Sequence, residues 1–140
     1  MNRPSAISRS ILIVDDDDAV RMVMKSILEE AGHRAEIATN GKEAIDRIAL
    51  GGIDLIITDL VMPEQEGIET IKLLRREHPE VKVIAMSGAF GGDYLQIAGF
   101  MGAHKTLVKP IRVQMVLDAV EEVFSDELHG TDRPAPEEPL

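Results

Sequence analysis

Residues 53–63 read IDLIITDLVMP, and in this stretch a mostly apolar run from Leu55 ends at the carboxylate of Asp59. Such a run is typical of a strand that is buried on both faces of a parallel sheet. Open parallel sheets bind ligands at the carboxyl ends of their strands, which is where Asp59 would stand. A single aspartate after a strand is more often a turn residue or a helix cap, so its importance depends on the rest of the chain.

Four more apolar runs alternate with segments of helical spacing. The predicted strands are 11–14, 35–38, 53–58, 81–86 and 104–108, and an amphipathic helical pattern follows each of them. Gly32, Gly51 and Pro79 mark helix ends, because glycine and proline terminate helices. Strands that alternate with helices predict an α/β fold with a five-stranded parallel sheet and helices on both faces.

The length of 140 residues fits one domain. We expect a flexible leader at 1–9, a single domain at 10–124, and a disordered, acidic, proline-containing tail at 125–140. Asp17 and Asp18 are expected as acids of the first helical turn, with a water-mediated role at a metal site as the alternative for Asp17. Asn40 with Glu43 is expected as a cap of the second helix.

The composition excludes several classes of function. Lysine and arginine number 15 against 25 acids, and the net charge of −10 argues against direct nucleic-acid or anionic-membrane partners. Without cysteine there can be no disulfide, thiolate metal site or thiol nucleophile. No signal-peptide core or membrane-length apolar run is present, so we expect a cytoplasmic protein. The histidines lack ligand spacing and predict surface or capping roles: His33, His78, His104 and His129.

Polar residues stand at the ends of four predicted strands: Asp15 and Asp16 after the first, Asp59 after the third, Ser87 after the fourth and Lys109 after the fifth. In a parallel sheet these residues converge on one edge. Three neighbouring carboxylates repel one another and favour a hard cation such as Mg²⁺. A phosphoryl group on Asp59 would then be neutralised by the cation, by Lys109 and by the Ser87 hydroxyl.

Four motifs carry a family resemblance over roughly residues 10–124: ILIVDDD at 11–17, DLIITDLVMP at 54–63, VIAMSG at 83–88 and LVKP at 107–110. With these motifs the chain resembles the receiver domain of two-component response regulators. The resemblance implies a doubly wound, flavodoxin-like sheet with the strand order 2-1-3-4-5.

The resemblance also implies roles for single residues. Asp59 would accept a phosphoryl group from the phosphohistidine of a histidine kinase or a phosphotransfer protein. Asp15, Asp16 and Asp59 would hold Mg²⁺, with Mn²⁺ as a substitute, and the backbone carbonyl of Val61 would complete the metal site. Ser87 would contact the phosphoryl oxygens.

Lys109 would pair with the phosphate, its position fixed by a cis peptide bond to Pro110. Two positions depart from the family pattern, since Thr106 and Ile111 replace residues that are usually aromatic. We therefore expect the signalling surface to respond through movement of the loop at 89–93. Val61 and the residue at 89 are apolar and cannot orient an attacking water, which predicts slow autodephosphorylation.

The favoured function is a stand-alone phosphorylation switch. It would catalyse its own phosphotransfer, unlike a conventional enzyme, and would signal by binding a downstream protein or by passing the phosphoryl group onward. One alternative is a receiver-like interaction module that never receives phosphate. The other is a phosphotransferase of the haloacid dehalogenase type, which Val61 disfavours because that group usually carries a second aspartate at this position. The sequence leaves the oligomeric state open.

Overall fold

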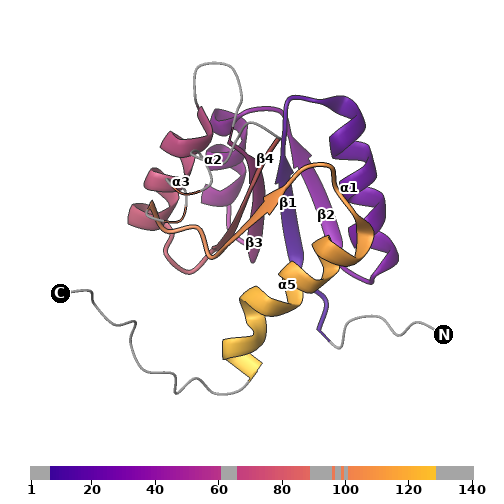
Figure 1. The fold of residues 1–140 in the computed structure, drawn as a ribbon. Helices are drawn as coiled ribbons and strands as arrows, with labels where there is room; N and C mark the ends of the chain where they lie inside the picture. Colours follow the sequence, from indigo (N-terminus) through magenta and orange to yellow (C-terminus); the bar gives the residue numbers. More distant parts are fainter. Residues whose placement is uncertain (1–6, 61–65, 89–95, 97–98, 100, 129–140) are drawn as a thin grey trace.

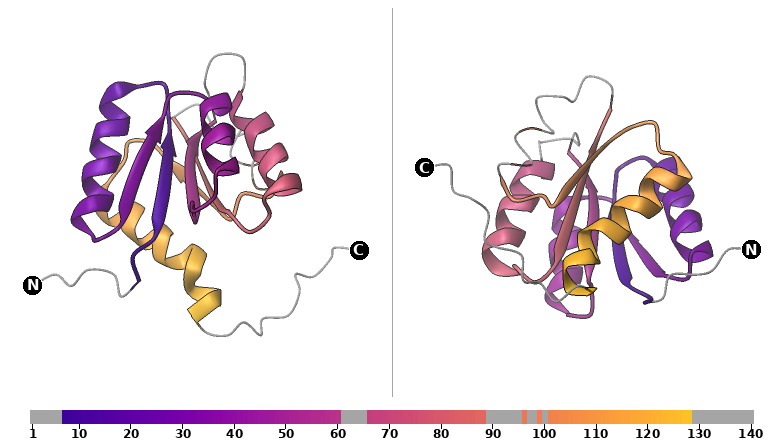
Figure 2. Two further views of the ribbon diagram at one scale, coloured as in Figure 1. Left: turned by 180° about the vertical axis from the view of Figure 1, so that it is seen from behind. Right: turned by 60° about the horizontal axis from the view of Figure 1, so that its bottom comes forward.

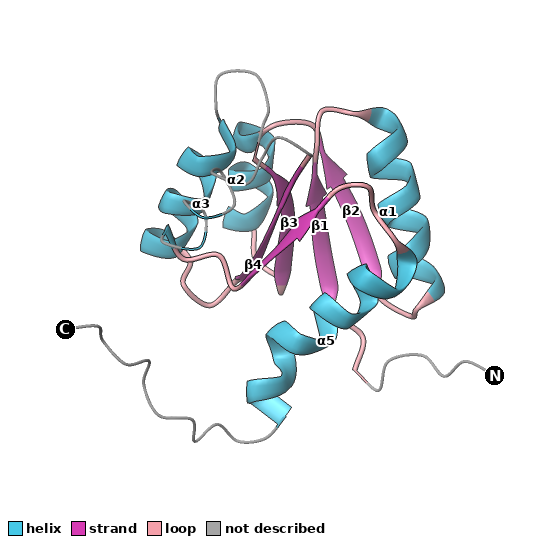
Figure 3. Cartoon of the chain, in the orientation of Figure 1, coloured by secondary structure: helices cyan, strands magenta, loops and turns pink. Residues whose placement is uncertain are grey.

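The chain folds around a parallel sheet, as the computed structural model shows for residues 7–60, 66–88, 96, 99 and 101–128 (Figures 1 and 3). The strand order is β2-β1-β3-β4-β5, which confirms the predicted order. All four strand pairings are parallel. The strands are Ser10–Val14 (β1), Arg34–Ala38 (β2), Leu55–Asp59 (β3), Lys82–Ser87 (β4) and Lys105–Val108 (β5).

Helices cover both faces of the sheet. The helices whose two ends lie within the described residues are Asp18–Glu30 (α1), Gly41–Ala49 (α2), Glu66–Glu77 (α3) and Val113–Leu128 (α5). Successive strand residues point to opposite faces, so Ile13 and Ile57 pack with α1 and α5, whereas Leu12 and Ile56 pack with α2 and α3. Figure 2 shows the two helical layers from behind and from below. None of the helices in the described part is long and apolar enough to cross a membrane.

The helix ends follow local sequence. Gly32 has a φ of 99° directly after the C-cap of α1, in the left-handed region that favours glycine. Asn40 caps α2 by accepting a hydrogen bond from the backbone N–H of Glu43 at 2.9 Å. The Glu43 carboxylate reaches back to the N–H of Thr39 at 2.8 Å and not to the expected N–H of Asn40. The predicted cap is thus present, with its reciprocal bond displaced by one residue.

Two predictions needed correction. The last helix continues to Leu128, four residues into the segment expected as tail. His33 is buried rather than superficial, and its Nδ1 accepts a hydrogen bond from the N–H of Arg9 at 3.0 Å. The expected fourth helix lies mostly outside the described residues, as does the rest of the tail at 129–140.

Candidate functional site

The carboxyl edge of the sheet brings the predicted site residues together. Strand register pairs Val14 with Thr58, so Asp15 follows β1 directly beside Asp59 at the end of β3. On the other side, Ser87 is the last residue of β4, and its carbonyl accepts a hydrogen bond from the N–H of Lys109 at 2.7 Å. Four residues that are separated by up to 94 positions therefore meet at one place, as the sequence predicts.

Three carboxylates form the acidic part of the site. Oxygen atoms of Asp15, Asp16 and Asp59 all lie within 4.8 Å of one another. Asp15 and Asp59 are buried, with 0% and 4% exposure, whereas Asp16 is exposed. Like charges this close repel, and hard oxygen ligands at one solvent-accessible point are what Mg²⁺ requires. The donor set thus fits a divalent cation.

Lys109 supplies the positive charge of the site. Its Nζ lies 3.0 Å from Oδ2 of Asp15 and 3.5 Å from Oδ2 of Asp59. Burial lowers the pKa of Lys109, but the hydrogen bond that its ammonium donates to Asp15 and the charge of Asp59 outweigh this, so the net pKa lies above its usual value. The ammonium is therefore retained beside both carboxylates. The peptide bond to Pro110 is cis, which confirms that expectation.

Ser87 adds a hydroxyl group without a partner. The residue is fully buried, and its Oγ has no hydrogen-bond partner within the described ranges. Buried hydroxyls are normally paired, because an unpaired one costs about 1–3 kcal/mol. An unpaired donor on the strand next to Asp59 fits an anionic group that carries acceptor oxygens, such as a phosphoryl group.

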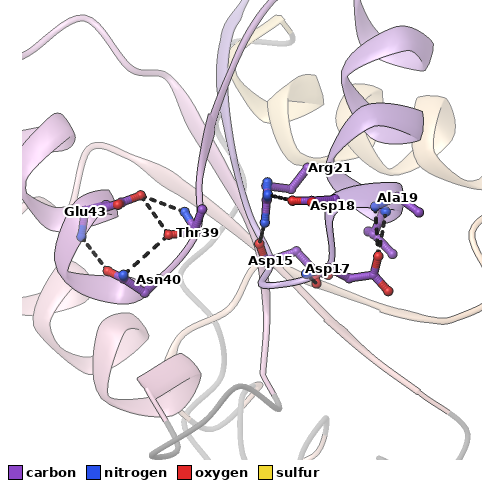
Figure 4. Close-up of polar contacts among 9 residues, drawn as sticks. Asp15, Asp17, Asp18, Ala19, Arg21, Thr39, Asn40 and Glu43 are labelled. Carbon is purple, nitrogen blue, oxygen red and sulfur yellow. Dashed lines mark hydrogen bonds and ion pairs between the residues drawn. The ribbon is translucent and has the colours of Figure 1, made fainter.

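Asp17 and Asp18 have structural roles at the start of α1 (Figure 4). Asp17 is the N-cap, and its Oδ1 accepts hydrogen bonds from the N–H groups of Ala19 at 2.8 Å and Val20 at 3.3 Å. Asp18 pairs with Arg21. The predicted first-turn role is confirmed for Asp18, while Asp17 precedes the first turn.

Two residues at the site were missed from the sequence. Arg21 is buried in α1 and donates to the backbone carbonyl of Asp15 at 2.6 Å. The sequence indicates this burial through spacing, because Arg21 lies on the same helix face as the buried Met24 and Leu28. Gly67 brings α3 against β3, because a Cβ there would lie 2.5 Å from the Cα of Leu60. A glycine inside an expected helix was its signal.

Of the positions that depart from the family pattern, the structure describes Thr106 and Ile111. Thr106 is half-buried in β5 and pairs in register with Ala85 of β4. Ile111 is partly buried against the core shared by α1 and α5. Val61, the predicted carbonyl ligand, lies outside the described residues, as does the loop at 89–93. The predictions made for that ligand and that loop stay predictions.

The family model "Response regulator receiver domain" matches residues 11–121. The chemotaxis protein CheY of Thermotoga maritima is 35% identical over 119 residues, which cover 84% of this chain and 98% of that protein. Some relatives are much longer, and the match covers 13% of the sensor kinase CckA of Brucella abortus.

Solved structures share the fold. A CheY-like response regulator receiver domain protein from Methanospirillum hungatei superimposes with a TM-score of 0.81 at 27% identity, covering 89% of this chain and 99% of that one. The receiver domain of Saccharomyces cerevisiae Ssk1, crystallised with the histidine phosphotransfer protein Ypd1, gives a TM-score of 0.78 at 23% identity. That match covers 86% of this chain and 91% of the other and shows the fold alone.

Proposed function

We propose that this chain, which belongs to the response regulator receiver domain family, accepts a phosphoryl group on Asp59 and signals through the phosphorylated state. The observation that supports this most strongly is the grouping around Asp59. A buried carboxylate, a half-buried ammonium and a buried, unpaired hydroxyl meet at one sheet edge. Each of these groups suits one part of an aspartyl phosphate.

The chemistry is a phosphoryl transfer between two nucleophiles. A carboxylate oxygen of Asp59 attacks the phosphorus of a phosphohistidine, a P–O bond forms and the P–N bond breaks. The histidine nitrogen leaves with the bonding electrons and takes up a proton from solvent. Lys109, which is 3.5 Å from Oδ2 of Asp59, would pair with the phosphoryl oxygens, and the Ser87 hydroxyl would donate to one of them.

Asp15, Asp16 and Asp59, with the carbonyl of Val61, would hold Mg²⁺, and Mn²⁺ would substitute. When bound, the cation would offset the negative charge that builds up on the phosphoryl oxygens. Lys109 already contacts Asp15 and Asp59, so binding of the cation would compete with this ammonium for the same oxygens and free it to meet the phosphate.

The proposed donor is a histidine kinase or a histidine phosphotransfer protein. The sensor kinase CckA of Brucella abortus, 32% identical over 119 residues, and the sporulation initiation phosphotransferase F of Bacillus subtilis, 29% identical over 115 residues, support this type of partner. The exchange would take place in the cytoplasm, in keeping with a sequence that lacks cysteine. The output would be a downstream protein that binds the phosphorylated form, or onward relay of the phosphoryl group. Slow autodephosphorylation would give such a partner time to bind.

The test is intact-mass measurement after incubation with acetyl phosphate and Mg²⁺. The parent protein should gain one phosphate, while the Asp59→Asn variant and the parent in EDTA should gain none. Time points after removal of the donor give the lifetime, which we expect to exceed seconds. If a control receiver is labelled and the parent is not, the phosphoacceptor function is wrong and a phosphate-independent interaction module replaces it.

A further inference from the structure

Arg21 is a buried cation that contacts the loop carrying two of the acids. It lies in the first turns of α1 with 8% of its surface exposed. One guanidinium nitrogen donates to the backbone carbonyl of Asp15 at 2.6 Å, and another pairs with the carboxylate of Asp18. Figure 4 shows the side chain lying across the turn between β1 and α1.

The energetics of Arg21 do not favour a purely stabilising role. Its charged partner, the Asp18 side chain, is 87% exposed, and pairs with exposed carboxylates contribute little stability. Its Nε is buried without a hydrogen-bond partner among the residues that the structure describes. Burying a guanidinium with one donor unpaired costs free energy. The well-formed contact that remains is the bond to the Asp15 carbonyl.

That carbonyl belongs to the peptide group that joins Asp15 to Asp16. The peptide group is planar, so a hydrogen bond that holds its oxygen also restricts the orientation of the backbone N and Cα of Asp16. Asp15 is also held through its side chain, by the N–H of Asp17 at 2.9 Å and by Lys109 at 3.0 Å. The Asp16 carboxylate is exposed and has no hydrogen bond or ion pair within the described ranges, so its position depends on its backbone.

We propose that Arg21 is a positioning residue for the cation site, which holds the peptide between Asp15 and Asp16 so that the Asp16 carboxylate faces Asp59 before a cation binds. This inference rests on the proposed cation site and adds a residue to it. Arg21 touches neither the cation nor the phosphoryl group. It acts through the backbone of the ligand residues.

Charge and position predict opposite effects when Arg21 is neutralised. A positive charge near three carboxylates repels a cation, so its removal alone would tighten Mg²⁺ binding. Loss of the fixed peptide would instead let Asp16 adopt other orientations and would weaken binding. Residues that orient metal ligands from outside typically contribute 10-fold or more to affinity. The direction of the change therefore separates the two effects.

The experiment compares Arg21→Met and Arg21→Lys with the matched control Arg47→Met. Arg47 of α2 also joins one carboxylate and one backbone carbonyl, those of Glu36 and Gly51, at 2.6 Å and 2.9 Å. Mg²⁺ is titrated into each unphosphorylated protein, and binding is followed by backbone amide shifts in two-dimensional NMR spectra. Phosphorylation by acetyl phosphate is then measured as a function of Mg²⁺ concentration.

We expect Arg21→Met to weaken Mg²⁺ binding about 10-fold, with the amide of Asp16 shifted before any cation is added. Arg21→Lys keeps the charge but not the planar fork, so it should also bind more weakly than the parent. The maximal phosphorylation rate should return close to that of the parent at saturating Mg²⁺. Arg47→Met should bind Mg²⁺ as the parent does.

Unchanged or tighter Mg²⁺ binding by Arg21→Met would overturn the inference and leave Arg21 as a buried charge without a positioning role. If that variant does not fold, Arg21→Lys decides in the same way. A parent that binds Mg²⁺ but is not phosphorylated would contradict the proposed function while leaving the positioning role standing. A parent that binds no Mg²⁺ would overturn the cation site and this inference together.

Discussion

Among the residues that the structure describes, polar groups at the amino edge of the sheet, where the strands begin, are hydrogen-bonded, whereas those at the carboxyl edge, where the strands end, are crowded or unpaired. At the amino edge, side chains pair with strand N–H groups: Ser10 donates to Asp54 at 2.8 Å, and Val83 donates to Nδ1 of His104 at 3.0 Å. At the carboxyl edge, three carboxylates crowd together and the buried Ser87 hydroxyl has no partner in the described part of the chain. The polar groups at the amino ends of the strands are thus hydrogen-bonded, whereas like charges are crowded at the carboxyl ends. Such a difference is expected when residues kept for binding lower the stability of the folded protein.

Lys109→Met should have the largest effect on stability. Its ammonium contacts the buried carboxylates of both Asp15 and Asp59, and its loss removes this positive charge from between them. We expect a loss of about 3 kcal/mol in urea unfolding in EDTA, partly restored by Mg²⁺. Lys105→Met is the control, since Lys105 pairs with the exposed Glu122 and should cost less than about 1 kcal/mol. Equal losses of stability in the two variants would mean that repulsion between the carboxylates at the carboxyl edge does not lower the stability of the protein.

Gly67→Ala should destabilise the protein by about 2 kcal/mol, because the new Cβ would meet backbone atoms of Asp59 and Leu60 at 2.5–2.7 Å. Separation of α3 from β3 should also lower the phosphorylation rate. Gly99→Ala is the matched control, since its Cβ would meet nothing within 4 Å. Thermal unfolding of both variants, followed by circular dichroism, measures the difference, and a neutral Gly67→Ala would contradict the close approach.

Carboxylate substitutions at the two edges should change stability in opposite directions. Asp54→Ala removes the acceptor of the Ser10 N–H and should cost about 1 kcal/mol. Asp59→Asn removes one of three neighbouring negative charges and should raise stability in EDTA by about 1 kcal/mol. Urea unfolding of both variants tests the contrast directly. Destabilisation by Asp59→Asn in EDTA would show that the protein's own groups already stabilise this carboxylate when no metal ion is bound.

The smallest expected effect is a pH dependence at the amino edge. Burial, together with the charges of Arg75 and Lys82, lowers the pKa of His104 to about 4. The unfolded chain would take up this proton near pH 6.5, before the folded protein does, so the contribution of His104 is present above pH 6.5 and is lost as the pH falls towards 4. His104→Asn should flatten the stability profile in that window by a small amount, because His104 is partly exposed. Profiles of the same slope in parent and variant would exclude this role.

The sequence predicts the strands and the polar residues at their ends because both depend on local patterns. Apolar runs define β1, β3 and β4, and parallel pairing then places Asp15, Asp59 and Lys109 together. Contacts that depend on three-dimensional proximity were not predictable in the same way. The bond from Arg21 to the Asp15 carbonyl depends on how α1 turns back over the loop, and the burial of His33 depends on a contact with the backbone of Arg9.

The end of α5 shows the limit of composition as a guide. Residues 125–128 read SDEL and were assigned to the polar tail, yet the helix runs through them to Leu128. Serine and acidic residues are only weakly unfavourable in a helix, so a helix already anchored by Val120 and Phe124 can continue through them. Polar composition therefore misplaced the end of the helix by four residues.

Chemical trapping of the acyl phosphate tests most directly whether Asp59 is the phosphoacceptor. The protein is phosphorylated with acetyl phosphate and Mg²⁺ and reduced with borohydride, which converts a phosphorylated aspartate into homoserine. Peptides are then mapped by mass spectrometry. We expect homoserine at position 59 only in the phosphorylated sample and not in an EDTA control. Homoserine at Asp15 or Asp16, or at no position in a sample that carries phosphate, would contradict this expectation.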